Sequence, residues 1–439
     1  MTEHPDLDLA GIGIGPFNLG LAALLSRHTH KSAAFFERKP QFSWHQGLLL
    51  PGTTLQVPFL ADLVTMADPT HPLSYLNYLH QHDRLYRFYY YDQFLIPRQE
   101  YDHYCRWAAQ QLPACQFGSE VCDVGHDAAR ERFVVEVESQ AGRSRWYSRD
   151  LAIGIGTRPW LPAWAENLTS ENISHAADFS ARQSQLSQRK SVTVMGSGQS
   201  AAECVLALLQ GLTPEQVAAG ASIQWVTRSV GFHPMEYSKL GQECFTPAYM
   251  DYFTALPRSQ RRQLVTEQGL LYKGISASTI AAIYDLLYER SIAGAEPGLR
   301  LYSNCEVADA ELLPGGAVRL HCRHRQLAQD CRLDCDAVVA ATGYRHAWPH
   351  WFEHLKHSVL ATDEHGDCLV DSDFIAQRQD GGRGRVFIQN AEVFQHGVGA
   401  PDLGIGAYRN AVIVNQLLGQ AHYRIPATTA FQHYGLPPQ

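Results

Sequence analysis

The apolar positions at the start of the chain predict a strand, a glycine turn and a helix in direct succession. Apolar residues mark a short strand over 9–14, residues 13–18 read Gly-Ile-Gly-Pro-Phe-Asn, and apolar positions restart at helical spacing over 19–25. Glycine permits positive φ and leaves bare backbone against a phosphate, while a helix start presents unpaired N–H groups to an anion. The pattern predicts a dinucleotide cradle in which Asn18 replaces the third glycine of the usual fingerprint.

The same pattern occurs a second time further along the chain. The strand expected at 191–195 leads into the turn Gly-Ser-Gly-Gln-Ser-Ala at 196–201, and a helix is expected over 202–210. In the first unit, the second strand at 33–37 ends in Glu37, where an acid can meet a ribose 2'-hydroxyl. Two such units predict either two bound dinucleotides or one duplicated nucleotide fold.

The second unit differs from the first in the charge that follows its second strand. Residues 223–227 form that strand, and Arg228 comes next, where the first unit has its acid. A guanidinium suits a 2'-phosphate that a carboxylate would repel, so this site favours NADP over NAD. The alternative interpretation is that Arg228 is a solvated strand end.

The remaining pattern predicts an α/β fold with two Rossmann-like dinucleotide-binding domains and a smaller, mostly helical substrate region. We expect the first domain over 1–185, the second over 186–335 with the helical region at 232–295, and a return segment to the first sheet over 336–439. Further expected elements are helices at 72–80, 99–111 and 406–419, a hairpin of 131–138 with 145–148 turning at Gly142, strands at 151–156, 336–343 and 385–389, and a polar crossing at 163–190.

Composition narrows the range of partners. The 439 residues carry a formal net charge of −8, which argues against nucleic acid or an anionic membrane as a partner. The first residues contain acids and no basic stretch, so no secretory signal is expected. Ten cysteines occur without any C-x-x-C, so we expect no metal site, redox dithiol or disulfide scaffold, and a cytoplasmic location.

Longer motifs extend nearly from end to end of the chain. They are GIGPFNL at 13–19, FSWHQG at 42–47, Gln56 with FLADLV at 59–64, SYLNYL at 74–79, GSGQSAAE at 196–203, ATGY at 341–344 and HG at 396–397. With these motifs the chain resembles the FAD- and NADPH-dependent N-hydroxylating monooxygenases of siderophore biosynthesis, which act on lysine, ornithine or diamines.

The resemblance assigns residues to two cofactors. It implies that FAD is bound by Gly13, Gly15, Pro16, Asn18, Glu37, Trp44, His45, Gln56, Val121, Asp402 and Leu403. It implies that NADPH is bound by Gly196, Gly198, Gln199, Ser200, Ala201 and Arg228. From the residues alone, the alternative is that Trp44 and Phe59 belong to the core and that His45 is a satisfied polar group.

The resemblance also implies the reaction. NADPH reduces the flavin, O2 adds at the flavin C4a position, and a neutral primary amine takes up one oxygen atom as a hydroxylamine. No nucleophilic side chain is needed, so we expect no catalytic residue in that sense; the protein positions the reactants and excludes water.

The substrate is suggested by the positions at which this chain departs from the family's amino-acid hydroxylases. Those enzymes carry a lysine for the substrate carboxylate where this chain has Ala61, and they differ again at Gln242 and Gly404. A buried carboxylate without its cation costs about 1–3 kcal/mol or more. We therefore expect a diamine, cadaverine ahead of putrescine, in a substrate site that includes Phe245.

Two acids, Glu243 and Asp402, are candidates for holding the distal ammonium of such a diamine. The rival hypothesis is an L-lysine N6-hydroxylase in which Lys39 or Lys273 replaces the missing cation. The resemblance further implies a homo-oligomer, commonly a tetramer.

Other classes fit less well. A flavin disulfide reductase needs a C-x-x-C, and a Baeyer-Villiger enzyme needs a linker motif F-x-G-x-x-x-H-x-x-x-W; the chain has neither. A nucleotide-binding sensor or scaffold without catalysis is compatible with the same fold.

Overall fold

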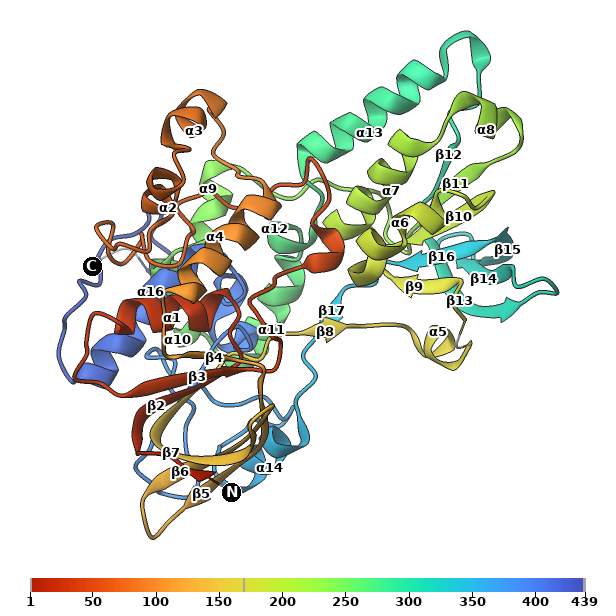
Figure 1. Ribbon diagram of the computed structural model, residues 1–439. Helices are drawn as coiled ribbons and strands as arrows, with labels where there is room; N and C mark the ends of the chain where they lie inside the picture. The colour runs from red at the N-terminus through yellow and green to blue at the C-terminus, as the bar shows by residue number, and fades with distance from the viewer. Residues whose placement is uncertain (1, 169, 437–439) are drawn as a thin grey trace.

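The first sheet of the computed structural model, which describes residues 2–168 and 170–436, has eight strands in the order β4-β3-β2-β7-β6-β5, with β1 and β18 also pairing with β7 (Figure 1). Its strands are β1 (Thr2–Glu3), β2 (Leu7–Ile12), β3 (Ala33–Glu37), β4 (Cys115–Phe117), β5 (Ser119–Asp127), β6 (Arg132–Ser139), β7 (Gly142–Ile153) and β18 (Val386–Ile388). The strand expected at 33–37 is confirmed residue for residue.

Strand β7 joins two segments that the sequence predicted as separate strands. Its first part pairs antiparallel with β6, and its second part pairs parallel with β2 and β18. The sequence pattern breaks at 149–150 because Asp150, although buried, is charged and pairs with Arg385 at 2.6 Å. Strand β5, which pairs with β6, was not anticipated.

The second sheet is entirely parallel, in the order β12-β11-β10-β16-β9. Its strands are β9 (Ile173–His175), β10 (Ser191–Met195), β11 (Ser222–Val226), β12 (Leu299–Tyr302) and β16 (Ala337–Ala340). Because β9 and β16 belong to this sheet, the boundaries expected at 185/186 and 335/336 are wrong: the second unit reaches from about 173 to about 340. A three-residue strand such as β9 is too short to show periodicity in a polar stretch.

Two smaller sheets complete the strands. The short pair β8 (Arg158–Pro159) and β17 (Tyr344–Arg345) lies where the chain crosses between the two lobes seen in Figure 1. An antiparallel meander of β13 (Cys305–Leu312), β14 (Val318–His324) and β15 (Gln329–Cys335) forms the outer edge of the second lobe. Of the two strands expected in the last third, only β18 returns to the first sheet; β16 stays in the second.

Helices cover the first sheet, and α1 packs directly on α16. Both begin earlier than the apolar pattern suggested, because Pro16 and the Asp402 cap are good helix starts. The helices of this lobe are α1 (Pro16–Leu25), η1 (Gln46–Leu48), α2 (Tyr75–Gln81), α3 (Leu85–Tyr91), α4 (Arg98–Gln110), α14 (His350–Ser358), α15 (Val393–His396), η5 (Gly397–Gly399) and α16 (Leu403–Leu418).

The region 232–295 is largely helical, as expected, and it serves both lobes. Helices α10 and α11 pack against α15 and η5 of the first lobe, whereas α13 packs on α7 of the second. The helices of this region are α9 (Lys239–Gln242), η3 (Glu243–Phe245), α10 (Pro247–Ala255), α11 (Arg258–Glu267), α12 (Leu270–Lys273), α13 (Ala277–Arg290) and η4 (Ile292–Gly294). The second lobe adds α5 (Ala163–Leu168), η2 (Ala176–Asp178), α6 (Phe179–Leu186), α7 (Gln199–Gly211) and α8 (Pro214–Ala218).

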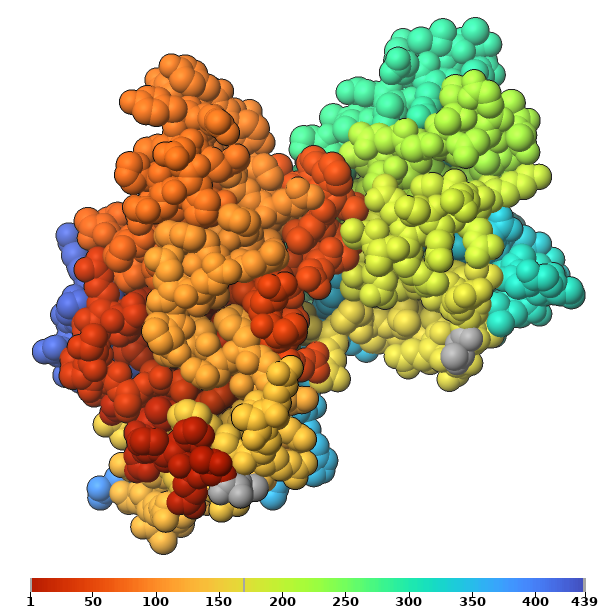
Figure 2. Space-filling model, viewed as in Figure 1, coloured from red at the N-terminus to blue at the C-terminus, as the bar shows by residue number. Residues whose placement is uncertain are grey.

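The two lobes touch through η1, which packs against η2 and α6 (Figure 2). A Cβ on Gly47 would lie 1.5 Å from the carbonyl oxygen of Ala177, so only glycine allows this close approach. Among the described residues, no helix combines the length and the apolar character needed to cross a membrane.

Candidate functional site

The first glycine turn has the backbone that a dinucleotide cradle requires. Gly13 has φ +84°, and a Cβ there would lie 2.6 Å from the carbonyl oxygen of Gly154. Gly15 is the N-cap of α1, and a Cβ there would meet no protein atom within 4 Å. The helix therefore points its first N–H groups at open space bordered by bare backbone.

A cavity of about 840 Å³ opens at this turn. The carboxylate of Glu37 lies at its edge and accepts hydrogen bonds from the backbone N–H groups of Ile14 and Lys39, both at 3.0 Å. Eight of the residues predicted for FAD line the cavity: Gly13, Gly15, Pro16, Glu37, Trp44, His45, Val121 and Leu403. The turn, the helix start and the fixed acid fit a dinucleotide with its pyrophosphate at α1.

Asn18 is predicted to contact FAD, but its side chain lies beneath the turn and does not line the cavity. It is fully buried and donates to the carbonyl oxygens of Gly13 at 2.8 Å and Ile12 at 3.2 Å. Its side-chain Oδ1 accepts a hydrogen bond from the side-chain amide of Gln389 at 2.6 Å. Asn18 thus connects the glycine turn to Gln389, the residue after β18, by a hydrogen bond. The sequence around Asn18 does not indicate this role, because its partner lies 371 residues away.

The second glycine turn repeats the geometry. Gly196 has φ +135°, and a Cβ there would lie 2.4 Å from the carbonyl oxygen of Ala341. Gly198 is the N-cap of α7, which begins at Gln199, three residues before the expected start. Arg228 is exposed just beyond the end of β11, the place where a residue recognising a 2'-phosphate belongs.

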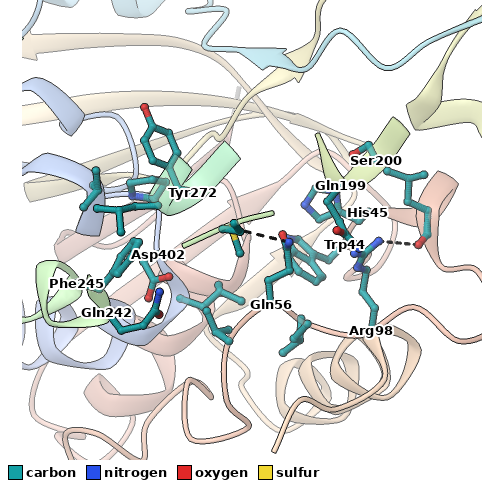
Figure 3. Close-up of a pocket in the computed structure, with 18 residues that line it drawn as sticks. Trp44, His45, Gln56, Arg98, Gln199, Ser200, Gln242, Phe245, Tyr272 and Asp402 are labelled. Atoms are coloured by element: carbon teal, nitrogen blue, oxygen red, sulfur yellow. Dashed lines mark hydrogen bonds between the residues drawn. The ribbon is translucent and has the colours of Figure 1, made fainter. Parts of the chain in front are cut away.

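A second cavity, of about 270 Å³, adjoins the first. The two share six lining residues: Trp44, His45, Leu48, Tyr272, Pro401 and Leu403. Figure 3 shows Asp402 and Gln242 on one side of this cavity and Gln199 and Ser200 on the other, with Gln56 between them. Of the residues predicted for NADPH, Gln199 and Ser200 reach this cavity, while Gly196, Gly198, Ala201 and Arg228 line neither cavity.

Asp402 carries the negative charge of this cavity. Its Oδ1 accepts the backbone N–H of Gly404 at 2.7 Å, which caps α16. Burial raises the pKa of Asp402 to about 6, against the opposing effects of that hydrogen bond and of Arg409. Burial, with smaller effects of Arg98 and Lys39, lowers the pKa of His45 to about 4, so its ring is neutral near pH 7.

Arg98 also lines the smaller cavity, but its charge is already paired. Its guanidinium donates to both carboxylate oxygens of Glu203, at 2.7 and 2.9 Å, and both side chains are buried. The pair links α4 of the first lobe to α7 of the second. Arg98 is therefore an interlobe contact and not an available phosphate ligand.

The substrate residues expected from the sequence separate into two groups. Gln242 and Phe245 line the smaller cavity, as expected. Ala61, which is 5% exposed, lines neither cavity, and neither does Gly404, whose N–H is bound by Asp402. Position 61, where the amino-acid hydroxylases carry a lysine, is therefore not part of the lining of either cavity.

Glu243 does not face the cavity, so its proposed role as an ammonium acceptor is wrong. Its carboxylate accepts the backbone N–H groups of Phe431 and Gln432, both at 3.0 Å, and these bonds lower its pKa. Glu243 holds the C-terminal segment in place, a contact 188 residues away in sequence.

A Glu243→Gln variant should therefore turn over the amine substrate that the resemblance implies nearly as well as the unchanged chain. We expect kcat/KM to change less than about threefold, as for substitutions outside a site. Steady-state measurement of hydroxylamine product checks this. A loss of tenfold or more would restore Glu243 as a substrate residue.

The sequence interpretation missed several residues of the smaller cavity. Leu271 and Tyr272 from α12 and Met235 from the loop before α9 line it. Gln56 lies beside Met235 and Ser276, 3.4 Å from the Ser276 hydroxyl. Met235, Leu271 and Tyr272 come from the region 232–295, where neither spacing nor residue type indicates a site.

Two dinucleotide cradles beside adjoining cavities are the arrangement of a flavoprotein oxidoreductase with FAD and a nicotinamide nucleotide. The family described as L-lysine 6-monooxygenase/L-ornithine 5-monooxygenase matches residues 6–346, and the chain belongs to this family. Its members are FAD- and NADPH-dependent N-hydroxylating monooxygenases, so the expected fold, enzyme class and cofactors are confirmed. The noncatalytic sensor or scaffold is not supported.

Individual relatives are similar over nearly the whole chain. The rhizobactin siderophore biosynthesis protein RhbE of Rhizobium meliloti is 64% identical over 98% of this chain and 96% of its own length. A putrescine N-hydroxylase of Shewanella oneidensis is 41% identical over 97% of this chain and 84% of its own. The crystal structure of DfoA bound to FAD, the cadaverine monooxygenase of desferrioxamine biosynthesis in Erwinia amylovora, superposes with a TM-score of 0.93 at 35% identity, covering 99% and 100% of the two chains.

Proposed function

We propose that the protein N-hydroxylates one terminal amine of an aliphatic diamine, cadaverine or putrescine, with NADPH and O2, in hydroxamate siderophore biosynthesis. The observation that carries the proposal is the charge of the smaller cavity. Of its described lining residues, Asp402 offers a carboxylate, and Arg98 is neutralised by Glu203. Relatives that act on putrescine and cadaverine and one in siderophore biosynthesis support the same assignment.

In this proposal the residues that line the cavity have two roles, binding the substrate and limiting access of water. Asp402 holds the distal end of the diamine as an ammonium, and the reacting amine must be neutral to accept oxygen. Trp44, Phe245 and Tyr272 form an apolar wall that limits access of water. Bound FAD, reduced by NADPH, supplies the activation of O2.

The rival substrate, L-lysine, fits this charge arrangement less well. Its carboxylate would lie in a cavity that contains Asp402 and no unpaired cation among the described lining residues. The two proposed substitutes, Lys39 and Lys273, line the larger cavity and not the smaller one, and Lys39 donates to the carbonyl oxygen of Ser43 at 3.0 Å. Repulsion from Asp402 would add to the cost of the unpaired carboxylate.

A panel of amines tests the proposal. The purified enzyme with FAD and NADPH is given α,ω-diamines of increasing chain length, L-lysine, L-ornithine and a monoamine, and hydroxylamine product is measured. We expect the best diamine to exceed lysine at least about tenfold in kcat/KM, since an unpaired carboxylate costs about 1–3 kcal/mol. Consumption of NADPH is not sufficient, because it continues when oxygen is reduced without hydroxylation.

A higher kcat/KM for lysine than for every diamine would overturn the proposed substrate and leave the enzyme class intact. The family resemblance also predicts a homotetramer, and the cysteine usage predicts a cytoplasmic location. Light scattering of the purified protein measures the first, and cell fractionation measures the second.

A further inference from the structure

Three cysteine thiols meet on the meander at the outer edge of the second lobe. The Sγ atoms of Cys305, Cys322 and Cys331 all lie within 4.8 Å of one another. All three are free cysteines. None of them lines either cavity, so the cluster is separate from the site described above.

Strand register brings these thiols together. Cys322 on β14 and Cys331 on β15 are directly opposed across the antiparallel pair. Cys305 on β13 is two residues before Val307, which is directly opposite Cys322, so Cys305 lies diagonally from Cys322 on the same face. The three strands thus present three sulfurs to one point.

We propose that this cluster binds one soft d10 cation, Zn²⁺ or Cu⁺, through the three cysteine sulfurs. Thiolates are the ligands that such ions prefer. A tetrahedral ion with bonds of about 2.3 Å holds its sulfurs about 3.8 Å apart, so small rotations of the side chains complete the site.

The exposure of the three residues agrees with a metal site that has one accessible side. Cys305 and Cys322 are 5% and 2% exposed, while Cys331 is exposed on the edge strand β15. Apolar packing accounts for the two buried cysteines but not for a third thiol on the exposed strand. Three sulfurs leave one position of a tetrahedral ion unfilled. Because the site is exposed on the side of Cys331, water or an exchanging ligand can take that position.

The bound ion would fasten β13, β14 and β15 to one another. These strands form a separate three-stranded antiparallel sheet and belong to neither of the two larger sheets. Each occupied site stabilises the folded state by mass action, so a rise in melting temperature of about 5 °C is expected at a hundredfold excess over the dissociation constant.

The test uses the full chain, loaded with FAD, freed of metal and kept reduced with a phosphine under argon. Zn²⁺ and Cu⁺ are titrated separately in competition with chelators, and Co²⁺ is added in place of Zn²⁺ to give thiolate charge-transfer absorption. We expect one equivalent of Zn²⁺ or Cu⁺ per chain. The competition constants show which ion binds more tightly.

A matched pair of variants identifies the ligands. Cys331→Ser removes an exposed thiol of the cluster, and Cys122→Ser removes an exposed thiol on β5 of the first sheet. We expect at least about tenfold weaker binding in Cys331→Ser and unchanged binding in Cys122→Ser. The proposal is overturned if neither ion binds stoichiometrically, if Cys331→Ser binds as tightly as the unchanged chain, or if Cys122→Ser loses the ion.

Discussion

The Gly15→Val variant is expected to fold and to bind FAD about 100-fold more weakly than the unchanged chain. Gly15 has an ordinary extended backbone, with φ −83° and ψ −179°, so valine adopts it without strain. The new side chain meets no protein atom at its Cβ and instead occupies the cavity at the start of α1. The substitution therefore lowers the affinity for FAD far more than it lowers the stability of the fold.

The size of the effect follows from the hydrogen bonds that the pyrophosphate would lose. Each hydrogen bond to a charged group contributes about 1.5–3 kcal/mol, and every 1.4 kcal/mol is a factor of ten in affinity. Losing one to two such bonds at the helix start gives about 100-fold. Gly15→Ala, with a smaller side chain, should give an intermediate loss.

Titration of FAD into the deflavinated protein measures this effect, and denaturant unfolding of the apo chain measures stability. The control is Gly125→Val on β5, where a Cβ also meets no protein atom within 4 Å but the cavity is elsewhere. Equal FAD affinities for Gly15→Val and the unchanged chain would show that the cofactor does not approach α1 at this glycine.

The cradles were predictable because each is encoded by contiguous residues. Strands at 33–37 and 191–195 occur where the apolar runs predicted them, and both glycine turns lead into helices. Gly13 and Gly196 show why: the backbone each adopts excludes other residues, so the constraint is visible in the sequence itself.

Features that depend on distant contacts were not predictable. Residues 173–175 became part of the second sheet only through pairing with β16, more than 160 residues later. In the sequence, Glu243 and Asp402 were equivalent candidates for binding the ammonium. The structure shows that Glu243 binds the C-terminal segment and that Asp402 lines the smaller cavity.

The cysteine cluster illustrates the same limit. Its members are separated by 16 and eight residues, so no short metal-binding motif appears in the sequence. The absence of C-x-x-C led to the expectation of no metal site, but three neighbouring strands can bring together cysteines that no motif connects.

Asp402→Asn is expected to lower kcat/KM for the diamine about 100-fold. Removing one partner of a buried charge pair costs about 2–5 kcal/mol. Asparagine is as good a helix cap as aspartate, so the hydrogen bond to Gly404 that begins α16 is kept. The substitution therefore removes the negative charge that Asp402 brings to the cavity and keeps the helix cap. Hydroxylamine formation by the two FAD-loaded proteins measures the difference.

The pH dependence separates this role from a structural one. Because the pKa of Asp402 is raised to about 6, the carboxylate is charged above that pH and becomes neutral below it. Deprotonation of the reacting amine affects both proteins alike, so it cancels in the ratio of their kcat/KM values. That ratio should be about ten at pH 5, about 50 at pH 6 and level off at about 100 above pH 7, because about a tenth of the Asp402 carboxylates are still charged one pH unit below the pKa. A ratio independent of pH would mean that the Asp402 charge does not bind the ammonium.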